Sequence, residues 1–249
     1  MTGPLEVLLD LIFPPKCVFC KKLLRKGETD LCPRCQEHLP WCVGPEAERT
    51  LEFVSLCASP LRYQDEVRES FHRYKFKGVR GYAKAYGRLM AQCVRDHLAG
   101  KYDLITWVPL SEQRRKARGY DQAMLLAEAT ALELGDVAAE TLVKVRDTSA
   151  QSGLGKDDSA RRANVLGAYR PADPELIAGR RILLIDDVVT TGSTLSECAR
   201  TLRTAGAADV VCVTLASARK WPPTPAGQTA ARKKDGFFPC TRGIFVSSF

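Results

Sequence analysis

Ten consecutive residues of this 249-residue chain, 185–194 (IDDVVTTGST), combine a pair of acids with a turn rich in hydroxyl groups. Asp186 and Asp187 are adjacent carboxylates, which suit the hydroxyls of a diol and a divalent cation. The residues that follow are rich in hydroxyls and include one glycine: Val188, Val189, Thr190, Thr191, Gly192, Ser193 and Thr194. A turn of this composition that opens a helix offers unpaired backbone N–H groups to a phosphate. One ligand with a diol and a phosphate would satisfy both halves.

The surrounding sequence predicts the elements that position this segment. Residues 182–185 (ILLI) are typical of a strand buried in a parallel sheet, which puts the acids at its carboxyl end, where open α/β sheets bind ligands. A helix is predicted after the turn, because apolar residues recur at Leu195, Ala199, Leu202 and Ala205. An acid pair or a hydroxyl turn alone would favour a helix N-cap beside two solvated acids. The register of strand, acids and turn favours a ligand site instead.

The segment resembles the phosphoribosyl pyrophosphate (PRPP) motif of type I phosphoribosyltransferases. The resemblance implies that Asp186 and Asp187 hold the ribose hydroxyls and help to organise Mg²⁺. It also implies that the loop after them wraps the 5′-phosphate of PRPP.

A second strand–loop–helix unit is predicted upstream, with a strand and turn at 104–110, a basic loop at 111–121 and a helix at 122–134. With a further strand at 209–216, the two units predict a parallel α/β sheet flanked by helices. A strand within 51–61 and helices over 63–77 and 82–98 are also expected. By the same resemblance, the pyrophosphate loop comprises Val108, Pro109, Leu110 and Ser111. A flexible loop over 112–121 would close on the site and supply the catalytic cations Arg114, Arg115, Lys116 and Arg118; the alternative for these four is a solvated surface.

Four of the ten cysteines form two CxxC pairs, Cys17 with Cys20 and Cys32 with Cys35, separated by eleven residues. This spacing brings four thiolates within tetrahedral reach of one Zn²⁺ and predicts a structural zinc ribbon. The pattern favours a structural over a catalytic zinc, because four thiolates leave no open coordination position. A redox dithiol and disulfides are the alternatives.

Three regions are predicted: an N-terminal helix and zinc module over 1–44, a phosphoribosyltransferase-like domain over 45–218, and a mobile basic tail over 219–249. The net charge of +8 suits an acidic ligand or a nucleic acid without separating the two. The apolar stretch 5–13 is too short to span a bilayer, and it has neither the basic start nor the composition of a secretory signal. No membrane insertion is expected, and the free thiols point to the cytoplasm.

The order of these features is similar to that of the ComF family, over roughly residues 5–218. The resemblance rests on the two CxxC pairs, 74–78 (YKFKG), 108–110 (VPL), 118–123 (RGYDQA), Gln151 with Leu154, 161–165 (RRANV) and the PRPP motif. Asp121 departs from the family's usual Asn, and an added anion there would affect what approaches the ribose. Lys75 and Arg161 either contact phosphate or cover a helix face.

The resemblance implies Mg²⁺-dependent transfer of a phosphoribosyl group to an unknown acceptor with release of pyrophosphate, linked to natural competence and DNA uptake. Its cofactors would be a structural Zn²⁺ and Mg²⁺ bound with PRPP. Two alternatives remain. In the first, the chain is a non-catalytic sensor of PRPP or a nucleotide. In the second, it handles single-stranded DNA together with competence proteins.

Overall fold

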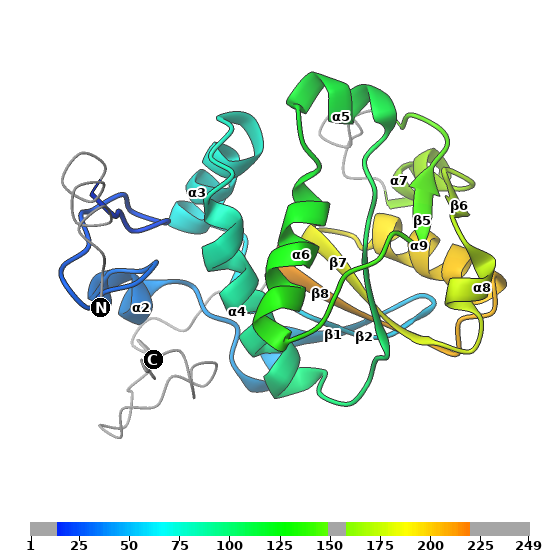
Figure 1. Cartoon of the computed structure of the whole chain (residues 1–249), viewed down its shortest axis with the longest axis horizontal. Helices are drawn as coiled ribbons and strands as arrows, with labels where there is room; N and C mark the ends of the chain where they lie inside the picture. The colour runs from blue at the N-terminus through cyan, green and yellow to red at the C-terminus, as the bar shows by residue number, and fades with distance from the viewer. Residues whose placement is uncertain (1–13, 149–157, 220–249) are drawn as a thin grey trace.

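The computed structural model describes residues 14–148 and 158–219, arranged as in Figure 1. The helices and strands follow one another as α2 (Pro33–His38), the 3-10 helix η1 (Gly44–Ala47), β1 (Glu48–Leu51), β2 (Val54–Ala58), β3 (Leu61–Arg62), α3 (Asp65–Phe76), α4 (Tyr82–His97), β4 (Leu104–Trp107), α5 (Glu112–Arg118), α6 (Gln122–Leu134), β5 (Leu142–Lys144), α7 (Asp158–Val165), β6 (Tyr169–Pro171), α8 (Pro174–Ile177), β7 (Arg181–Val189), α9 (Ser193–Thr204) and β8 (Asp209–Ser217). The helix predicted over 5–13 and the tail over 219–249, except Arg219, lie outside the described residues, as do Gln151 and Leu154.

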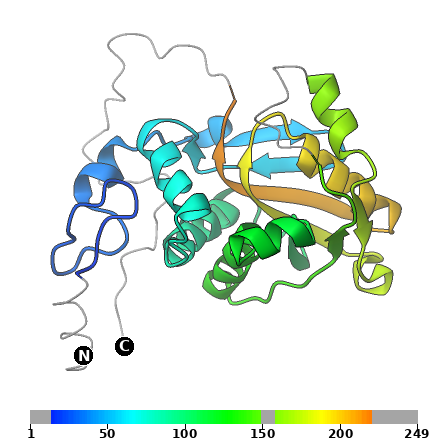
Figure 2. The same ribbon diagram turned by 90° about the horizontal axis from the view of Figure 1, so that it is seen from above.

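The main sheet is six-stranded and mostly parallel, which confirms the predicted fold class. Its order is β1-β2-β8-β7-β4, with β3 also paired to β8, and only β1 runs antiparallel to its neighbour. Successive residues of β7 alternate between two buried clusters, because side chains along a strand point to opposite faces. Leu183 and Ile185 join the cluster that includes α4 and α6, whereas Ile182 and Leu184 join the one that includes α9. Figure 2 shows these helices on opposite sides of the sheet.

The elements beside the predicted ligand site are mostly as expected. Helix α6 has the predicted bounds, Gln122–Leu134, and ends at Gly135, whose φ of +75° suits a glycine C-cap. The strand expected over 51–61 is shorter than predicted: β2 covers Val54–Ala58, and a turn at Phe53, with φ +64°, separates it from β1. A small antiparallel sheet of β5 and β6 was not predicted.

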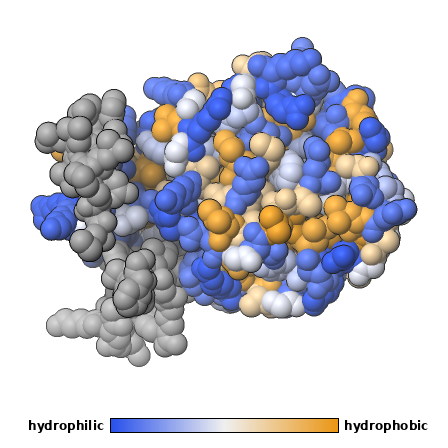
Figure 3. Space-filling model, viewed as in Figure 1, coloured by the Kyte–Doolittle hydropathy of each residue, from blue (hydrophilic) through white to orange (hydrophobic). Residues whose placement is uncertain are grey.

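The prediction of a loop over 112–121 is wrong for most of that range, because residues 112–118 form the helix α5. Ser111 caps this helix by accepting a hydrogen bond from the Arg114 N–H, and Gly119 ends it with φ +75°. Both capping signals were present in the sequence, but the charge of the segment favoured a loop. Figure 3 shows the surface over α5 as hydrophilic, as expected for a helix without buried residues.

The zinc-ribbon module packs directly against the helices of the larger domain. Phe19 is buried with its ring centroid 6.0 Å from that of Tyr86 on α4. On α3, the Arg73 guanidinium donates to the Val18 carbonyl at 3.0 Å and also to that of Phe19. Cys17, Cys32 and Cys35 therefore belong to the same buried cluster as α3, α4 and α6. None of the helices within the described ranges is both long and apolar enough to cross a bilayer.

Candidate functional site

The acid pair lies near the carboxyl end of β7, as predicted, although the strand continues through Val189. Asp187 forms an ion pair with Lys75 of α3, with 2.9 Å between Oδ2 and Nζ, and the two side chains are only 16% and 26% exposed. Among the described residues, no lysine or arginine forms an ion pair with Asp186. The site thus contains two carboxylates but only one cation in contact with them.

The electrostatics of the pair follow from this imbalance. Burial and the neighbouring Asp187 charge raise the pKa of the Asp186 carboxyl well above its usual range. Burial alone would lower the pKa of Lys75, but the Asp187 charge outweighs it and the pKa is raised. Lys75 is therefore a cation at neutral pH. The raised pKa favours the protonated form of Asp186 while no cation is beside it, and a bound divalent cation would favour the carboxylate. Carboxylate oxygens are ligands that Mg²⁺ prefers, so the residues present fit this ion.

The hydroxyl turn connects β7 to α9 and is ordered by contacts within it and behind it. Gly192 adopts φ +89° at the N-cap of α9, a conformation that favours glycine. The Thr191 and Ser193 hydroxyls lie 2.8 Å apart. A Cβ on Gly192 would lie 2.6 Å from Cδ2 of Leu51. The close packing of Leu51 is therefore a second reason for a glycine at this position, and the sequence did not reveal it. A cleft of about 360 Å³ borders the turn, and its walls include Arg49, Arg162, Thr191, Ser193 and Ser196.

The predicted pyrophosphate loop, residues 108–111, follows β4, which pairs with β7. Two of its backbone N–H groups are already engaged: that of Val108 with the Ile185 carbonyl and that of Leu110 with Asp121, both at 2.9 Å. Pro109 has no N–H. Within this loop only Ser111 retains a backbone donor for a ligand. The backbone of these four residues can therefore donate a hydrogen bond to a leaving group only through the Ser111 N–H.

Asp121, the departure from the family pattern, has a structural role. Its carboxylate is 4% exposed and accepts hydrogen bonds from the N–H groups of Leu110, Ala123 and Met124, at 2.9, 3.0 and 3.2 Å. It therefore caps α6 and fixes the exit of β4 at the same time. The hydrogen bonds hold this carboxylate against the backbone.

We predict that Asp121→Ala lowers the free energy of unfolding by about 2 to 3 kcal/mol, because a helix cap is lost and the Leu110 N–H is left unpaired. Asp121→Asn can still cap α6 and should cost about 1 kcal/mol. Urea denaturation measures both. Asp136→Ala is the matched control, since its carboxylate accepts only one exposed N–H bond, from Val137. A loss below about 0.5 kcal/mol for Asp121→Ala would contradict this role.

The four predicted catalytic cations have different surroundings on and beside α5. Arg114 donates to the Thr148 carbonyl, and Arg118 donates to Gln122 Oε1 at 2.7 Å. Lys116 is exposed and pairs with Glu112 one turn away, and Arg115 is exposed. Among their described contacts, none reaches the acid pair. Their catalytic role therefore stays a prediction.

Two residues near the site were weakly predicted from the sequence or not predicted at all. Lys75 was one of two weak candidates, and its signal was its place in the segment 74–78. Arg49 was not predicted at all, yet it donates to the backbone carbonyls of Thr190 and Thr191. The side chain of Arg161, the other weak candidate, lies outside the described residues.

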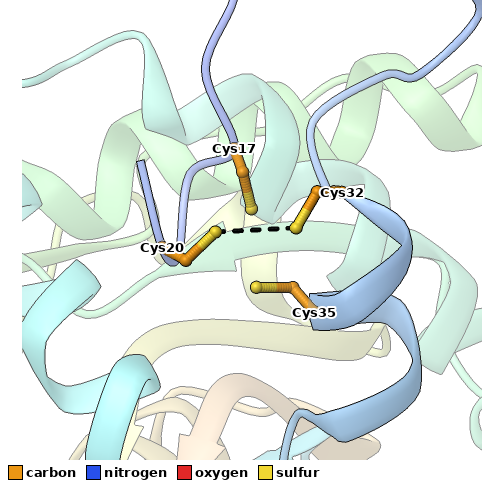
Figure 4. A group of neighbouring side chains, drawn as sticks. All are labelled: Cys17, Cys20, Cys32 and Cys35. Atoms are coloured by element: carbon orange, nitrogen blue, oxygen red, sulfur yellow. Dashed lines mark hydrogen bonds between the residues drawn. The ribbon is translucent and has the colours of Figure 1, made fainter. Parts of the chain in front are cut away.

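The cysteine site has the geometry that the spacing predicted. The thiol sulfurs of Cys17, Cys20, Cys32 and Cys35 all lie within 4.8 Å of one another and point to one centre (Figure 4). None of the described cysteines forms a disulfide. Four soft thiolate ligands around one point fit Zn²⁺, and their number closes the coordination shell.

Two family models match the chain. Residues 121–235 match the phosphoribosyl transferase domain, and residues 8–49 match the double zinc ribbon domain. Fold, acid pair and cysteine site thus define a class, in which a phosphoribosyltransferase-type domain follows a zinc ribbon.

The chain matches relatives of known name over most of their length. Competence protein F of Haemophilus influenzae is 30% identical over 217 residues, which cover 78% of this chain and 93% of that protein. DNA utilization protein YhgH of Salmonella typhi is 33% identical over 221 residues, covering 80% and 96%. Competence protein ComFC of Streptococcus pneumoniae is 29% identical over 186 residues, covering 74% of each. The chain belongs to the ComF family.

Proposed function

We propose that this protein binds PRPP together with Mg²⁺ at the carboxyl end of β7. The observation that carries the proposal is the sequence of groups at that strand end: two carboxylates, one of them held by Lys75, followed at once by a glycine-containing hydroxyl turn at the start of α9. The turn suits the 5′-phosphate, because a helix N-terminus favours anions. Asp186 and Asp187 suit the ribose hydroxyls, which donate hydrogen bonds to carboxylates.

The reaction we propose is transfer of the phosphoribosyl group to an acceptor. The bond between C1′ and the pyrophosphate oxygen breaks, a bond between C1′ and the acceptor forms, and the acceptor releases a proton. When bound, Mg²⁺ would be held by Asp186 and Asp187 and would neutralise charge on the leaving pyrophosphate. The carboxylates also oppose the positive charge that develops at the ribose. Lys75 fixes the position of Asp187, and Arg114, Arg115, Lys116 and Arg118 are the cations proposed to face the pyrophosphate.

Release of pyrophosphate tests whether the protein is an enzyme. We expect the full chain with PRPP and Mg²⁺ to release pyrophosphate when a suitable acceptor is present, measured over a panel of nucleobases, nucleosides and amines. If the protein binds PRPP but releases no pyrophosphate above background with any acceptor, the transferase proposal is wrong. The non-catalytic sensor is then the better account.

A role with DNA is supported by the names of the relatives, which are competence and DNA utilization proteins. We propose that the phosphoribosyl chemistry or PRPP sensing serves DNA uptake. Direct handling of single-stranded DNA is the second candidate, since the net charge of +8 favours polyanions. Fluorescence anisotropy with a labelled oligonucleotide tests it, because affinity must fall steeply as salt rises. No binding at low salt would reject this candidate.

A further inference from the structure

The edge strand β1 supports the phosphate-binding turn from behind. Arg49 and Leu51 both belong to this strand, with a register shift between them, and both side chains reach the turn. The Arg49 guanidinium donates to the Thr190 carbonyl at 3.0 Å and to the Thr191 carbonyl at 3.3 Å. Leu51 occupies the space that a Cβ on Gly192 would need. Three successive residues of the turn are therefore held by one strand more than 130 residues away in sequence.

The two carbonyl contacts determine where the N–H groups of the turn point. In a planar trans peptide the C=O and the following N–H point in opposite directions. Because Arg49 draws the carbonyls of Thr190 and Thr191 towards itself, the N–H groups of Thr191 and Gly192 point away from it. Adjacent N–H groups on one side of a turn are the arrangement that binds a phosphate. Without Arg49, either peptide could rotate and present a carbonyl oxygen, which repels an anion.

The surroundings of Arg49 suit this role. Its side chain lines the cleft of about 360 Å³ beside the turn, together with Thr191 and Ser193. Burial lowers the pKa of its guanidinium, but an arginine stays charged at neutral pH. Its positive charge therefore strengthens the hydrogen bonds that it donates to the two carbonyls.

We propose that Arg49 is a positioning residue that holds the Thr190–Gly192 backbone in its phosphate-binding conformation. The inference rests on the proposed function, because the ligand it prepares for is the 5′-phosphate of PRPP. Arg49 itself acts through the peptide groups and takes no part in bond making or breaking.

The test compares Arg49→Met and Arg49→Lys with the parent protein by calorimetry, using two ligands with Mg²⁺. PRPP carries the 5′-phosphate, whereas inorganic pyrophosphate represents only the leaving group. We expect Arg49→Met to weaken PRPP binding about tenfold or more, Arg49→Lys to recover part of it, and pyrophosphate binding to stay unchanged. Arg203→Met is the control, since Arg203 donates to the Phe53 carbonyl in the turn between β1 and β2 and pairs with Asp209, and none of its described contacts reaches residues 190–192. It should bind PRPP like the parent.

Amide hydrogen exchange of peptides that span residues 188–195 gives a readout that does not depend on PRPP binding. Arg49→Met should exchange faster there than both the parent and Arg203→Met. If the parent fails to bind PRPP but this acceleration is found, the proposed function fails and the positioning role stands. Unchanged exchange, or pyrophosphate binding weakened as much as PRPP binding, would overturn the inference.

Discussion

Removal of zinc should unfold more of this protein than its cysteine-rich segment. Zinc binding contributes about 10 to 16 kcal/mol to the folding of isolated zinc-finger peptides. Here the ligands Cys17, Cys32 and Cys35 lie in the buried cluster that also includes α3 and α4. Loss of the metal frees the Val18 and Phe19 carbonyls that Arg73 of α3 holds. Since α3 carries Lys75, the effect should reach Asp187.

Cys17→Ser measures this effect. We expect the variant to bind less than one zinc per chain, to melt at a clearly lower temperature than the parent, and to lose PRPP affinity. Metal analysis, thermal unfolding and calorimetry give the three results. Cys212→Ala is the control, because this buried cysteine of β8 lies outside the four-cysteine site. Parent protein without zinc, or a Cys17→Ser protein as stable as the control, would contradict the expectation.

Replacement of either acid by its amide should abolish most turnover while the fold is preserved. Asp186→Asn and Asp187→Asn keep the size of the side chain but remove the charge that, in the proposed function, faces the ribose and Mg²⁺. We expect turnover to fall roughly 10²-fold or more, and PRPP affinity to fall less. The stability of Asp186→Asn should not fall, because burial and the neighbouring Asp187 charge already disfavour the charged form of Asp186. Pyrophosphate release and thermal unfolding measure the two effects.

Asp187→Asn leaves Lys75 without its partner, so a loss of stability could be mistaken for a loss of catalysis. The double variant Asp187→Asn with Lys75→Met removes both charges, so it distinguishes a loss of stability from a loss of catalysis. It should recover stability but not turnover. If turnover returns with stability, Asp187 acts through the fold and not on the ligand.

Local signals in the sequence were sufficient for the elements around the ligand site. The apolar run 182–185 and the helical spacing from Leu195 predicted β7 and α9, and the bounds of α6 were predicted correctly. The CxxC spacing predicted the cysteine site, because short loops alone bring those thiols together. The segment that forms α5 was predicted to be a basic loop, whereas its capping residues, Ser111 and Gly119, indicate a helix.

The contacts that hold the site could not be predicted in the same way. Lys75 and Asp187 are 112 residues apart, and Arg49 is 141 residues from Thr190. Neither pairing leaves a periodic pattern, since each depends on how the sheet places distant segments. The role of Asp121 was missed for a similar reason. Its N-cap of α6 is local, but its bond to Leu110 depends on the path of the chain after β4.

Isothermal titration calorimetry of the full chain with PRPP, in the presence and in the absence of Mg²⁺, tests the central claim most directly. The acid pair and the turn predict one PRPP bound per chain, with an affinity that depends on Mg²⁺ and falls in Asp187→Asn. Absence of PRPP binding by folded, zinc-loaded protein with Mg²⁺, or equal binding by the parent and Asp187→Asn, would contradict the account.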